Sequence, residues 1–394
     1  MESSPLDGHL PRYLAPGIAL FEVVDDELLP IKPLGIQLNQ GDTATPIFTP
    51  EDGFNWKIAK ACFEASDFII HEVVSHLGNT HLVLEGPMVA MHRQLPKEHP
   101  IHVLLEPHLE GTAFINWGAQ ELLMVKDGGV DRLQGNKVEQ SWTLVLEQTL
   151  ARISKDFSPE VDFKARRMTK EDFPGRYPYR DSGLMYWEAT HTWVKDYLDL
   201  YYEDDDGISG DYELQGFVDE MINLGKMKWL EELASCENKK SLLAKVLASM
   251  IYTASTLHAA VNFPQRSIMS FAPNTPGSIY AAPPTNKEER TFEDYLAYLP
   301  PIEIATTQVV LGTLLGSIYH TRLGDYETHH FGDERVQKPL AKFQQTIEDI
   351  ETHMVDENAY VVAAWRQRGK DKKDAANFGY TVLLPDNIPQ SINI

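Results

Sequence analysis

Cysteine and basic residues are scarce in this sequence. Two cysteines, Cys62 and Cys236, occur among 394 residues, too few for a disulfide framework or a cysteine-rich zinc site. Because no signal peptide is recognisable either, we expect a reducing, cytoplasmic environment. Lysine and arginine number 35 against 58 aspartates and glutamates, which gives a net charge of −23. Such an acidic chain repels nucleic-acid phosphates and anionic lipid headgroups, so we expect no nucleic-acid partner.

Long apolar runs and several catalytic motifs are also missing. No stretch reaches the ~18 consecutive apolar residues that a membrane-spanning helix needs, so we expect at most peripheral membrane contact. The sequence has no Gly-x-Ser-x-Gly elbow, P-loop, Gly-x-Gly-x-x-Gly fingerprint or His-Glu-x-x-His motif. This argues against the corresponding hydrolases, nucleotide-binding proteins and zinc proteases. Apolar residues nevertheless make up 43% of the chain, which is enough for a large buried core.

The N-terminal segment, residues 1–50, differs from the rest of the chain. It is rich in proline, and its two apolar runs at 18–24 and 31–38 have the composition of strands. Asp25-Asp26 lies between these runs and is typical of a turn. We therefore predict a short β-hairpin within an otherwise irregular segment.

Apolar residues with helical spacing dominate the remainder. From Phe54 they recur every three to five positions, and no proline appears until Pro87, which predicts a long, central, buried helix. We expect a mostly α fold in which 1–394 forms one large domain with the N-terminal segment packed on it. Further helices are predicted at 113–124, 140–155, 184–202, 214–224, 240–263, 304–320 and 336–358.

Two histidines of the predicted long helix could share a metal ion. His76 and His81 are five residues apart, and such positions point about 140° away from each other on a regular α-helix, which has ~3.6 residues per turn. They could bind one ion only if the helix contains an i→i+5 π-bulge, a feature found often at functional sites. Otherwise each is an ordinary core or surface histidine, which is the commoner case for a single residue.

A second pair and the chain end add three possible ligands. His258 and Asn262 are four residues apart in a predicted helix, so their side chains share a face. The chain ends in the apolar Ile394, whose carboxylate would be costly to bury without a partner such as a metal. Three imidazoles, one amide oxygen and one carboxylate suit iron or manganese better than zinc or calcium.

At this point the sequence resembles the lipoxygenase family. Five histidines occur with spacers of four, four, seventeen and eight residues, as in the family's iron helix and the segment after it. The resemblance covers nearly the whole chain from about residue 19. The matching residues are Trp56, Ala59-Lys60, His71-Glu72, Ser75-His76-Leu77, Thr80-His81, Glu85, His99-Pro100, Leu104-Leu105, Pro107-His108, Thr112, Ile115-Asn116, Tyr177-Pro178-Tyr179, Trp187, Trp193-Val194-Lys195, Tyr201-Tyr202, Glu213-Leu214-Gln215, 258–263, Gln265 and the terminal isoleucine.

The resemblance implies roles for individual residues. Gln265 matches an amide that links the ligand sphere to the substrate channel, and Leu123 and Leu315 match an apolar clamp on the reactive methylene. Ala119 matches the position whose size influences where oxygen adds, and His71 matches a structural or outer-sphere histidine. The implied iron ligands are His76, His81, His258, Asn262 and the Ile394 carboxylate.

The resemblance also implies a reaction. A small bacterial-type lipoxygenase catalytic domain, without the family's N-terminal PLAT β-barrel, would use non-haem iron (Fe²⁺/Fe³⁺). It would add O2 to a polyunsaturated fatty acid of the linoleic or α-linolenic class and form a hydroperoxide. Manganese is the less favoured metal. The alternatives are a hydroperoxide isomerase with the same iron site and a non-catalytic lipid- or metal-binding protein.

Two positions depart from the family pattern. Thr275 stands where the family has an arginine that can hold the fatty-acid carboxylate, and Gln120 replaces an arginine common after the Ala119 position. Arg93, Arg266 or another basic residue could bind the carboxylate instead, or the methyl end of the substrate could enter first. The sequence therefore leaves the substrate's orientation open, and it does not indicate the oligomeric state.

Overall fold

The computed structural model describes residues 10–316 and 321–393. The chain divides into two compact units, each made of three separate stretches. Unit 1 comprises Met1–Gly78, Asn116–Glu147 and Val261–Ile318, and unit 2 comprises Asn79–Ile115, Gln148–Ala260 and Tyr319–Ile394. Helical residues far outnumber strand residues in both units, and the one sheet among the described residues has three strands. The predicted mostly α fold is confirmed.

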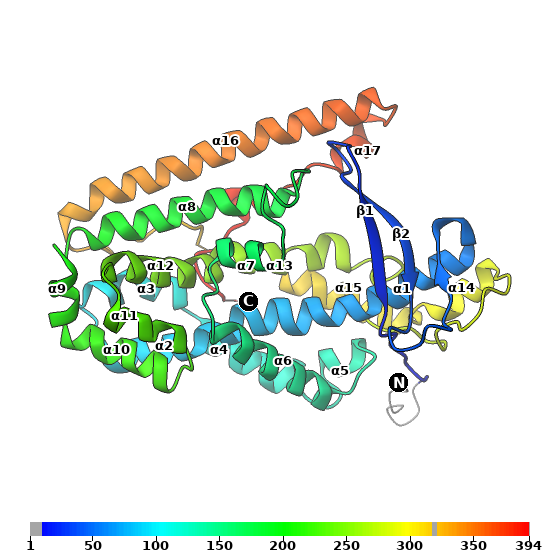
Figure 1. Ribbon diagram of the computed structural model, residues 1–394, viewed down its shortest axis with the longest axis horizontal. Helices are drawn as coiled ribbons and strands as arrows, with labels where there is room; N and C mark the ends of the chain where they lie inside the picture. Colours follow the sequence, from blue (N-terminus) through cyan, green and yellow to red (C-terminus); the bar gives the residue numbers. More distant parts are fainter. Residues whose placement is uncertain (1–9, 317–320, 394) are drawn as a thin grey trace. The chain divides into compact units, whose positions relative to one another are not determined.

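The sheet in unit 1 contains the predicted hairpin. Strand β1 (Ile18–Val23) pairs antiparallel with β2 (Ile31–Gln37) (Figure 1). Strand β2 also pairs antiparallel with β3 (Ile47–Phe48). In the turn, the Asp26 carboxylate accepts hydrogen bonds from the backbone N–H groups of Leu28 and Leu29. An Asx-type bond of this kind is why aspartate favours turns.

The predicted long helix is present and begins in unit 1. It starts as α1 (Phe54–Ile69), continues as the π-helix η2 (Ile70–Leu82) and ends as α2 (Val83–Gln94). The buried face of α1 packs with residues of β2 and β3 in one hydrophobic cluster. Helix α14 (Phe292–Tyr298) also lies against α1.

A second group of unit 1 elements surrounds α15 (Ile302–Leu315). This helix packs against the π-helix η6 (Gln265–Met269) and against α5 (Gly129–Leu133). Their close approach depends on Gly312, because a Cβ atom there would lie only 2.8 Å from the backbone oxygen of Gln265. The predicted helix over 304–320 is thus present up to its residue 315, and 317–320 lie outside the described residues.

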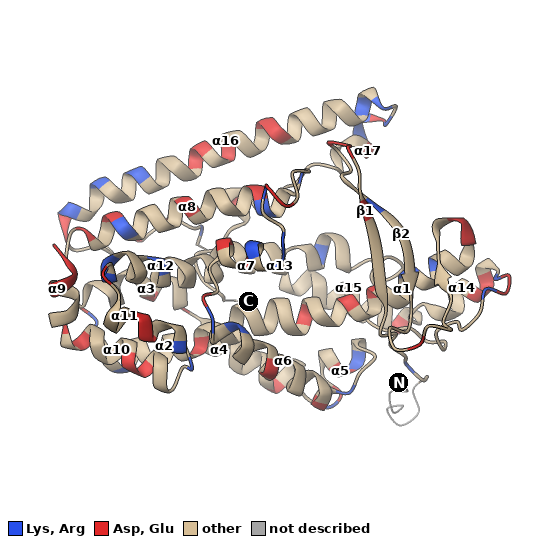
Figure 2. Ribbon diagram, in the orientation of Figure 1, with Lys and Arg blue, Asp and Glu red and all other residues tan. Residues whose placement is uncertain are grey.

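Unit 2 is built around α8 (Pro178–Leu198). Helix α8 packs against α12 (Lys239–Tyr252) and against α16 (Gln337–Gln367), which runs beside it (Figure 1). Along α16, charged residues of both signs occupy the solvent side (Figure 2). Its buried positions recur at helical spacing: Leu340, Phe343, Ile347, Ile350, Met354, Val361 and Trp365.

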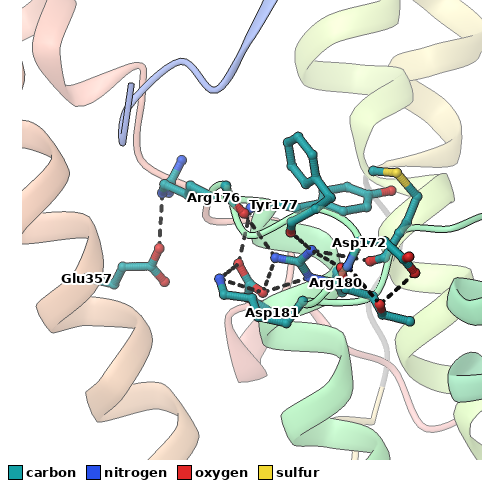
Figure 3. A network of polar contacts seen from close by, with 11 residues as sticks. Asp172, Arg176, Tyr177, Arg180, Asp181 and Glu357 are labelled. Atoms are coloured by element: carbon teal, nitrogen blue, oxygen red, sulfur yellow. Dashed lines mark hydrogen bonds and ion pairs between the residues drawn. The ribbon is translucent and has the colours of Figure 1, made fainter. Parts of the chain in front are cut away.

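A buried arginine fixes the loop before α8. The Arg180 side chain is fully buried, and its guanidinium contacts the Asp181 carboxylate at 2.7 Å (Figure 3). The guanidinium lies 5.6 Å from the ring of Tyr177. Arg176 forms an ion pair of 3.0 Å with Glu357 of α16. The carbonyl groups that accept hydrogen bonds from Arg180 are those of Met168, Thr169, Phe173 and Gly175.

The remaining helices complete the two units. Those at predicted positions are α4 (Thr112–Gly118) with η3 (Ala119–Leu123), α6 (Val138–Ile153), α10 (Tyr212–Asn223), and η5 (Thr253–Leu257) with α13 (His258–Asn262). Those not predicted include α3 (Pro100–Leu109), α7 (Pro159–Ala165), α9 (Asp205–Gly210), α11 (Glu232–Ser235) and α17 (Lys372–Ala376). The helical run Lys239–Met269 is long and apolar enough to cross a membrane, but 83% of its most apolar window is buried within the protein.

Candidate metal centre

The π-helix η2 carries the first two candidate ligands. His76 and His81 are both buried, with 6% and 4% of their surface exposed. In a π-helix each turn is closed by an i→i+5 hydrogen bond, so residues five apart lie one turn apart on the same side. The i→i+5 geometry that the histidine spacing required is therefore present. It extends over 13 residues rather than one turn.

A third histidine lies close to these two. The rings of His81 and His258 lie 5.0 Å apart, edge to face, and His258 is fully buried. One nitrogen from each of His76, His81 and His258 lies within 4.8 Å of the other two. Two nitrogens that are each about 2.1 Å from an ion lie at most ~4.2 Å apart. Small ring movements therefore suffice for the three histidines to bind one ion, and the arrangement fits a metal.

Asn262 is held with its amide oxygen in a defined direction. Its Nδ2 donates to the backbone oxygen of Leu315 at 3.1 Å, and its Oδ1 accepts from Gln265 Nε2 at 3.0 Å. These two bonds distinguish the nitrogen from the oxygen of the amide. Oδ1 keeps one lone pair available for a metal, because Gln265 uses the other.

Gln265 connects two of the candidate ligands. Its Nε2, besides donating to Asn262, lies 3.2 Å from Nδ1 of His76. The side chain is buried with 4% exposure, so water does not compete for these bonds. Outer-sphere contacts of this kind orient metal ligands, and the role that the resemblance implies for Gln265 stays a prediction.

Glu72 is a site residue for which the sequence suggested no role. One carboxylate oxygen lies 3.3 Å from Nδ1 of His71, and the other lies 3.6 Å from Nδ1 of His76. Burial alone would raise the pKa of Glu72, but the hydrogen bonds and charges of the two histidines lower it to about 2. The i, i+4 spacing between Glu72 and His76 was the signal that could have identified the contact.

A narrow pocket in unit 1 lies beside Gln265. Its volume is about 70 Å³, and Leu123 and Leu315 both line it, together with Glu72. Ala119 is buried within η3 but does not line this pocket. The resemblance paired the two leucines as a clamp, and the structure brings both to one pocket.

Two further predicted site residues remain, His71 and Ile394. His71 is half-buried and contacts Glu72 at 3.3 Å. Ile394, predicted to donate its carboxylate, lies outside the described residues. The segment before it is buried in unit 2, where Thr112 Oγ1 donates to the carbonyl of Ile392 at 3.2 Å.

A second cluster of possible ligands in unit 2 has a structural explanation. His99, Asp211 and Glu213 lie close together. His99 Nδ1 accepts from the backbone N–H of Ile101, which caps α3, and its Nε2 lies 3.1 Å from the Asp211 carboxylate. Both imidazole nitrogens are therefore already used. Asp211 in turn accepts from the backbone N–H of Leu214 at the start of α10.

Comparison with known proteins agrees with this geometry. A sequence model of the family described as Lipoxygenase matches residues 27–385. The chain is 34% identical to a Linoleate 9/13-lipoxygenase of Pseudomonas aeruginosa, over 96% of this chain and 54% of that protein. It is 33% identical to the Hydroperoxide isomerase ALOXE3 of Rattus norvegicus, over 81% of this chain and 45% of that protein.

A solved structure shows the same fold. A calcium-dependent 11R-lipoxygenase superimposes with a TM-score of 0.87 at 27% identity, covering 100% of this chain and 56% of that one. The chain spans about half the length of the curated relatives that it matches. The family match over most of the sequence and the shared fold lead to one conclusion: the chain belongs to the lipoxygenase family.

Proposed function

We propose that the protein is a non-haem iron dioxygenase that adds O2 to a polyunsaturated fatty acid with a cis,cis-1,4-pentadiene unit. The observation that carries this proposal is the buried group of three histidines, one of which is joined through Gln265 to Asn262. The substrate class rests on the relative named as a linoleate 9/13-lipoxygenase.

The proposed ligands are His76, His81, His258, Asn262 and the carboxylate of Ile394. Iron is favoured over manganese because the family to which the chain belongs uses iron, and the N/O donor set suits either ion. When bound, iron supplies the one-electron redox chemistry that removes a hydrogen atom from the bis-allylic carbon. Elemental analysis of the purified protein distinguishes the metals, since stoichiometric manganese would overturn the choice of iron.

The protein side chains then hold the ion and position the substrate. Leu123 and Leu315 contact the pentadiene unit from the pocket wall, and the apolar lining excludes water from the radical formed there. We propose that Ala119 leaves room for oxygen at one end of this unit. The pocket of about 70 Å³ is smaller than the ~300–1,000 Å³ typical of small-molecule sites, so we expect lining side chains to move when a fatty acid enters.

One incubation tests the proposed reaction. The purified protein is mixed with linoleic or α-linolenic acid in air, and the conjugated-diene absorbance and oxygen consumption are followed together. We expect both signals to rise in proportion, and His258→Ala to abolish both. If neither changes although stoichiometric iron is present, the proposal is wrong.

The same assay tests the second candidate, a hydroperoxide isomerase. This alternative is supported by the similarity to the isomerase ALOXE3. An isomerase would consume added fatty-acid hydroperoxide, form epoxyalcohols or related products and take up little oxygen. Product analysis by mass spectrometry separates the two activities, because a dioxygenase increases the substrate mass by two oxygen atoms.

A further inference from the structure

A row of oxidisable aromatic side chains crosses unit 2. The ring centroid of Tyr326 lies 6.3 Å from that of Trp193, Trp193 lies 5.6 Å from Tyr197, and Tyr197 lies 5.0 Å from Tyr201. Tyrosine and tryptophan are among the side chains that lose one electron most readily. Neighbouring rings at these distances are in or near van der Waals contact, so an electron can pass from one to the next.

At one end of the row, Tyr326 has a base ready to accept its proton. The hydroxyl of Tyr326 lies 3.0 Å from Nε2 of His108, and Nδ1 of His108 lies 2.8 Å from the carbonyl oxygen of Gln390. A carbonyl only accepts, so Nδ1 carries the imidazole proton and Nε2 accepts the hydroxyl proton of Tyr326. Burial lowers the pKa of His108 to about 4, which keeps the imidazole neutral near pH 7.

The Tyr201 end has a base nearby as well. Tyr201 is half-buried, and the guanidinium of Arg335 lies 5.4 Å from its ring. Burial raises the pKa of Tyr201, and so does the nearby Asp333 carboxylate, which pairs with Arg335 at 2.6 Å. Hydrogen bonds from Arg335 lower the pKa of Asp333 to about 2, so this carboxylate is ionised. The phenol proton of Tyr201 therefore has an acceptor at the protein surface.

The two residues between these ends have no such base. Tyr197 donates its hydroxyl to the backbone carbonyl of Pro100 at 2.9 Å, and an amide oxygen is a very weak base. Trp193 is buried between the rings of Phe343 and Phe331, each 5.8 Å away. An oxidised phenol is a strong acid and is stable only once its proton has moved to a base. A stable radical is therefore expected on Tyr326 or Tyr201, whereas Trp193 and Tyr197 are oxidised only transiently as the electron passes.

We propose that Tyr326 and His108 form a redox-active pair, and that Trp193, Tyr197 and Tyr201 carry its oxidising equivalent to the surface of unit 2. For its oxidant the pair rests on the proposed function: a one-electron reductant of the ferrous-ion class that cleaves the O–O bond of the fatty-acid hydroperoxide product gives an alkoxyl radical and hydroxide. His108 is bonded to the C-terminal segment that leads to the proposed ligand Ile394.

The electrons and protons of this step balance. The alkoxyl radical takes one electron from Tyr326 and one proton from water, and becomes an alcohol while hydroxide is left. The phenol proton moves to Nε2 of His108, which leaves a neutral phenoxyl radical beside an imidazolium. An electron then passes from Tyr201 along the row to Tyr326, the proton of His108 returns to Tyr326, and the phenol proton of Tyr201 passes to Asp333. A small soluble reductant of the thiol or ascorbate class finally gives one electron to Tyr201, which recovers its proton from Asp333, and the proton that the reductant loses neutralises the hydroxide.

The test uses an external oxidant, so that it does not depend on the proposed enzyme activity. The full-length chain as purified is mixed with tris(bipyridine)ruthenium, which a light flash and a sacrificial acceptor convert to the ruthenium(III) oxidant. Tyrosyl radicals are then recorded by freeze-quench electron paramagnetic resonance. We expect a long-lived tyrosyl signal that forms more slowly in D2O, because a proton moves with the electron.

Three variants assign the signal. Tyr326→Phe removes only a hydroxyl and is expected to abolish the component whose spectrum reports a hydrogen bond from an imidazolium, while the radical on Tyr201 remains. Trp193→Phe is expected to leave the Tyr201 radical but to prevent the transfer of oxidation from Tyr201 to Tyr326. Tyr186→Phe is the control, because it also removes one hydroxyl, from a buried tyrosine that donates to the carbonyl of Leu383. Persistence of the imidazolium-bonded component in Tyr326→Phe refutes the pair, and its persistence in Trp193→Phe refutes the route. Absence of a tyrosyl signal in the unaltered protein refutes both.

A second measurement tests whether the row of aromatic residues protects the enzyme from oxidative inactivation. With iron bound and excess fatty-acid hydroperoxide added, we expect Tyr326→Phe and Trp193→Phe to inactivate after fewer turnovers than Tyr186→Phe. Equal lifetimes in all three variants would show that the row does not protect the protein. The flash experiment would still report on the pair if the protein proved to have no dioxygenase activity, so failure of this inference and failure of the proposed function are distinguishable.

Discussion

Replacing Gln265 with leucine is expected to weaken metal binding while leaving the protein folded. Gln265 Nε2 bonds to Asn262 Oδ1 at 3.0 Å and lies 3.2 Å from His76 Nδ1. Leucine has nearly the same volume as glutamine but cannot form either contact. Asn262 would then lose the hydrogen bond that orients its amide oxygen, and His76 would lose a polar neighbour, whereas the packing around residue 265 would change little.

The size of the effect follows from these contacts. A hydrogen bond contributes a net ~0.5–1.5 kcal/mol, so loss of the bond to Asn262 corresponds to about 0.5–1.5 kcal/mol. Because ~1.4 kcal/mol is a factor of ten in an equilibrium constant, the dissociation constant for Fe²⁺ should rise roughly twofold to tenfold. Loss of outer-sphere partners elsewhere costs ~10–100-fold in metal affinity or activity, so the upper end of the calculated range is expected.

Gln308→Leu is a closely matched control. Gln308 is also buried, lines the same pocket and donates two hydrogen bonds from Nε2, but to the backbone carbonyls of Met269 and Thr275. We expect both variants to lose a similar amount of stability toward urea and only Gln265→Leu to lose metal affinity. Anaerobic titration of the metal-free variants with Fe²⁺ against a competing chelator measures this affinity. Equal affinities in the two variants would refute the proposed role of Gln265.

Three further changes should have distinct outcomes. Leu315→Ala should lower kcat and broaden the set of oxygenated positions, seen by chiral chromatography of the products, whereas Leu314→Ala on the exposed side of the same helix should not. Arg180→Met should lower the free energy of unfolding by about 3 kcal/mol or more because it removes a buried charge from its partners, whereas Arg176→Met should cost clearly less; equal urea midpoints would contradict this. The buried His108 has a pKa of about 4 in the folded protein and ~6.5 when unfolded. The unfolded chain therefore binds more protons between these pH values, and acidification from pH 6.5 to 4 should remove up to about 3 kcal/mol of stability. His108→Gln should reduce this pH dependence in urea titrations, and an unchanged slope would be evidence against the assignment.

The spacing of the histidines predicted an unusual helix only on the condition that both bind one ion. A five-residue interval is incompatible with convergence on a regular α-helix, so a shared ion would require i→i+5 geometry. The structure has a π-helix over Ile70–Leu82 that contains both His76 and His81. The hairpin was equally predictable, because two apolar runs flank an aspartate turn whose bonds are local.

Elements stabilised mainly by distant residues were harder to predict. Helix α3 (Pro100–Leu109) begins at a proline after His99, whose imidazole accepts from the backbone N–H of Ile101. Histidine is not among the usual N-cap residues, so this start was not recognised. Helix α16 was predicted to end at 358 but continues to Gln367, since Val361 and Trp365 are buried against other parts of the protein. Such burial outweighs a weak local helix preference.

Part of the candidate site lies in the backbone and could not be read from residue identities. Leu315 was predicted to act through its side chain, yet its carbonyl oxygen also holds the amide of Asn262 at 3.1 Å. Every residue has a carbonyl group, so no sequence pattern marks this contact. The carbonyl reaches Asn262 because α15 approaches η6 closely at Gly312, where a Cβ atom would lie 2.8 Å from the Gln265 backbone oxygen. The direction of a proposed metal ligand therefore depends on a residue that has no side chain, and only the three-dimensional structure shows why glycine is needed there.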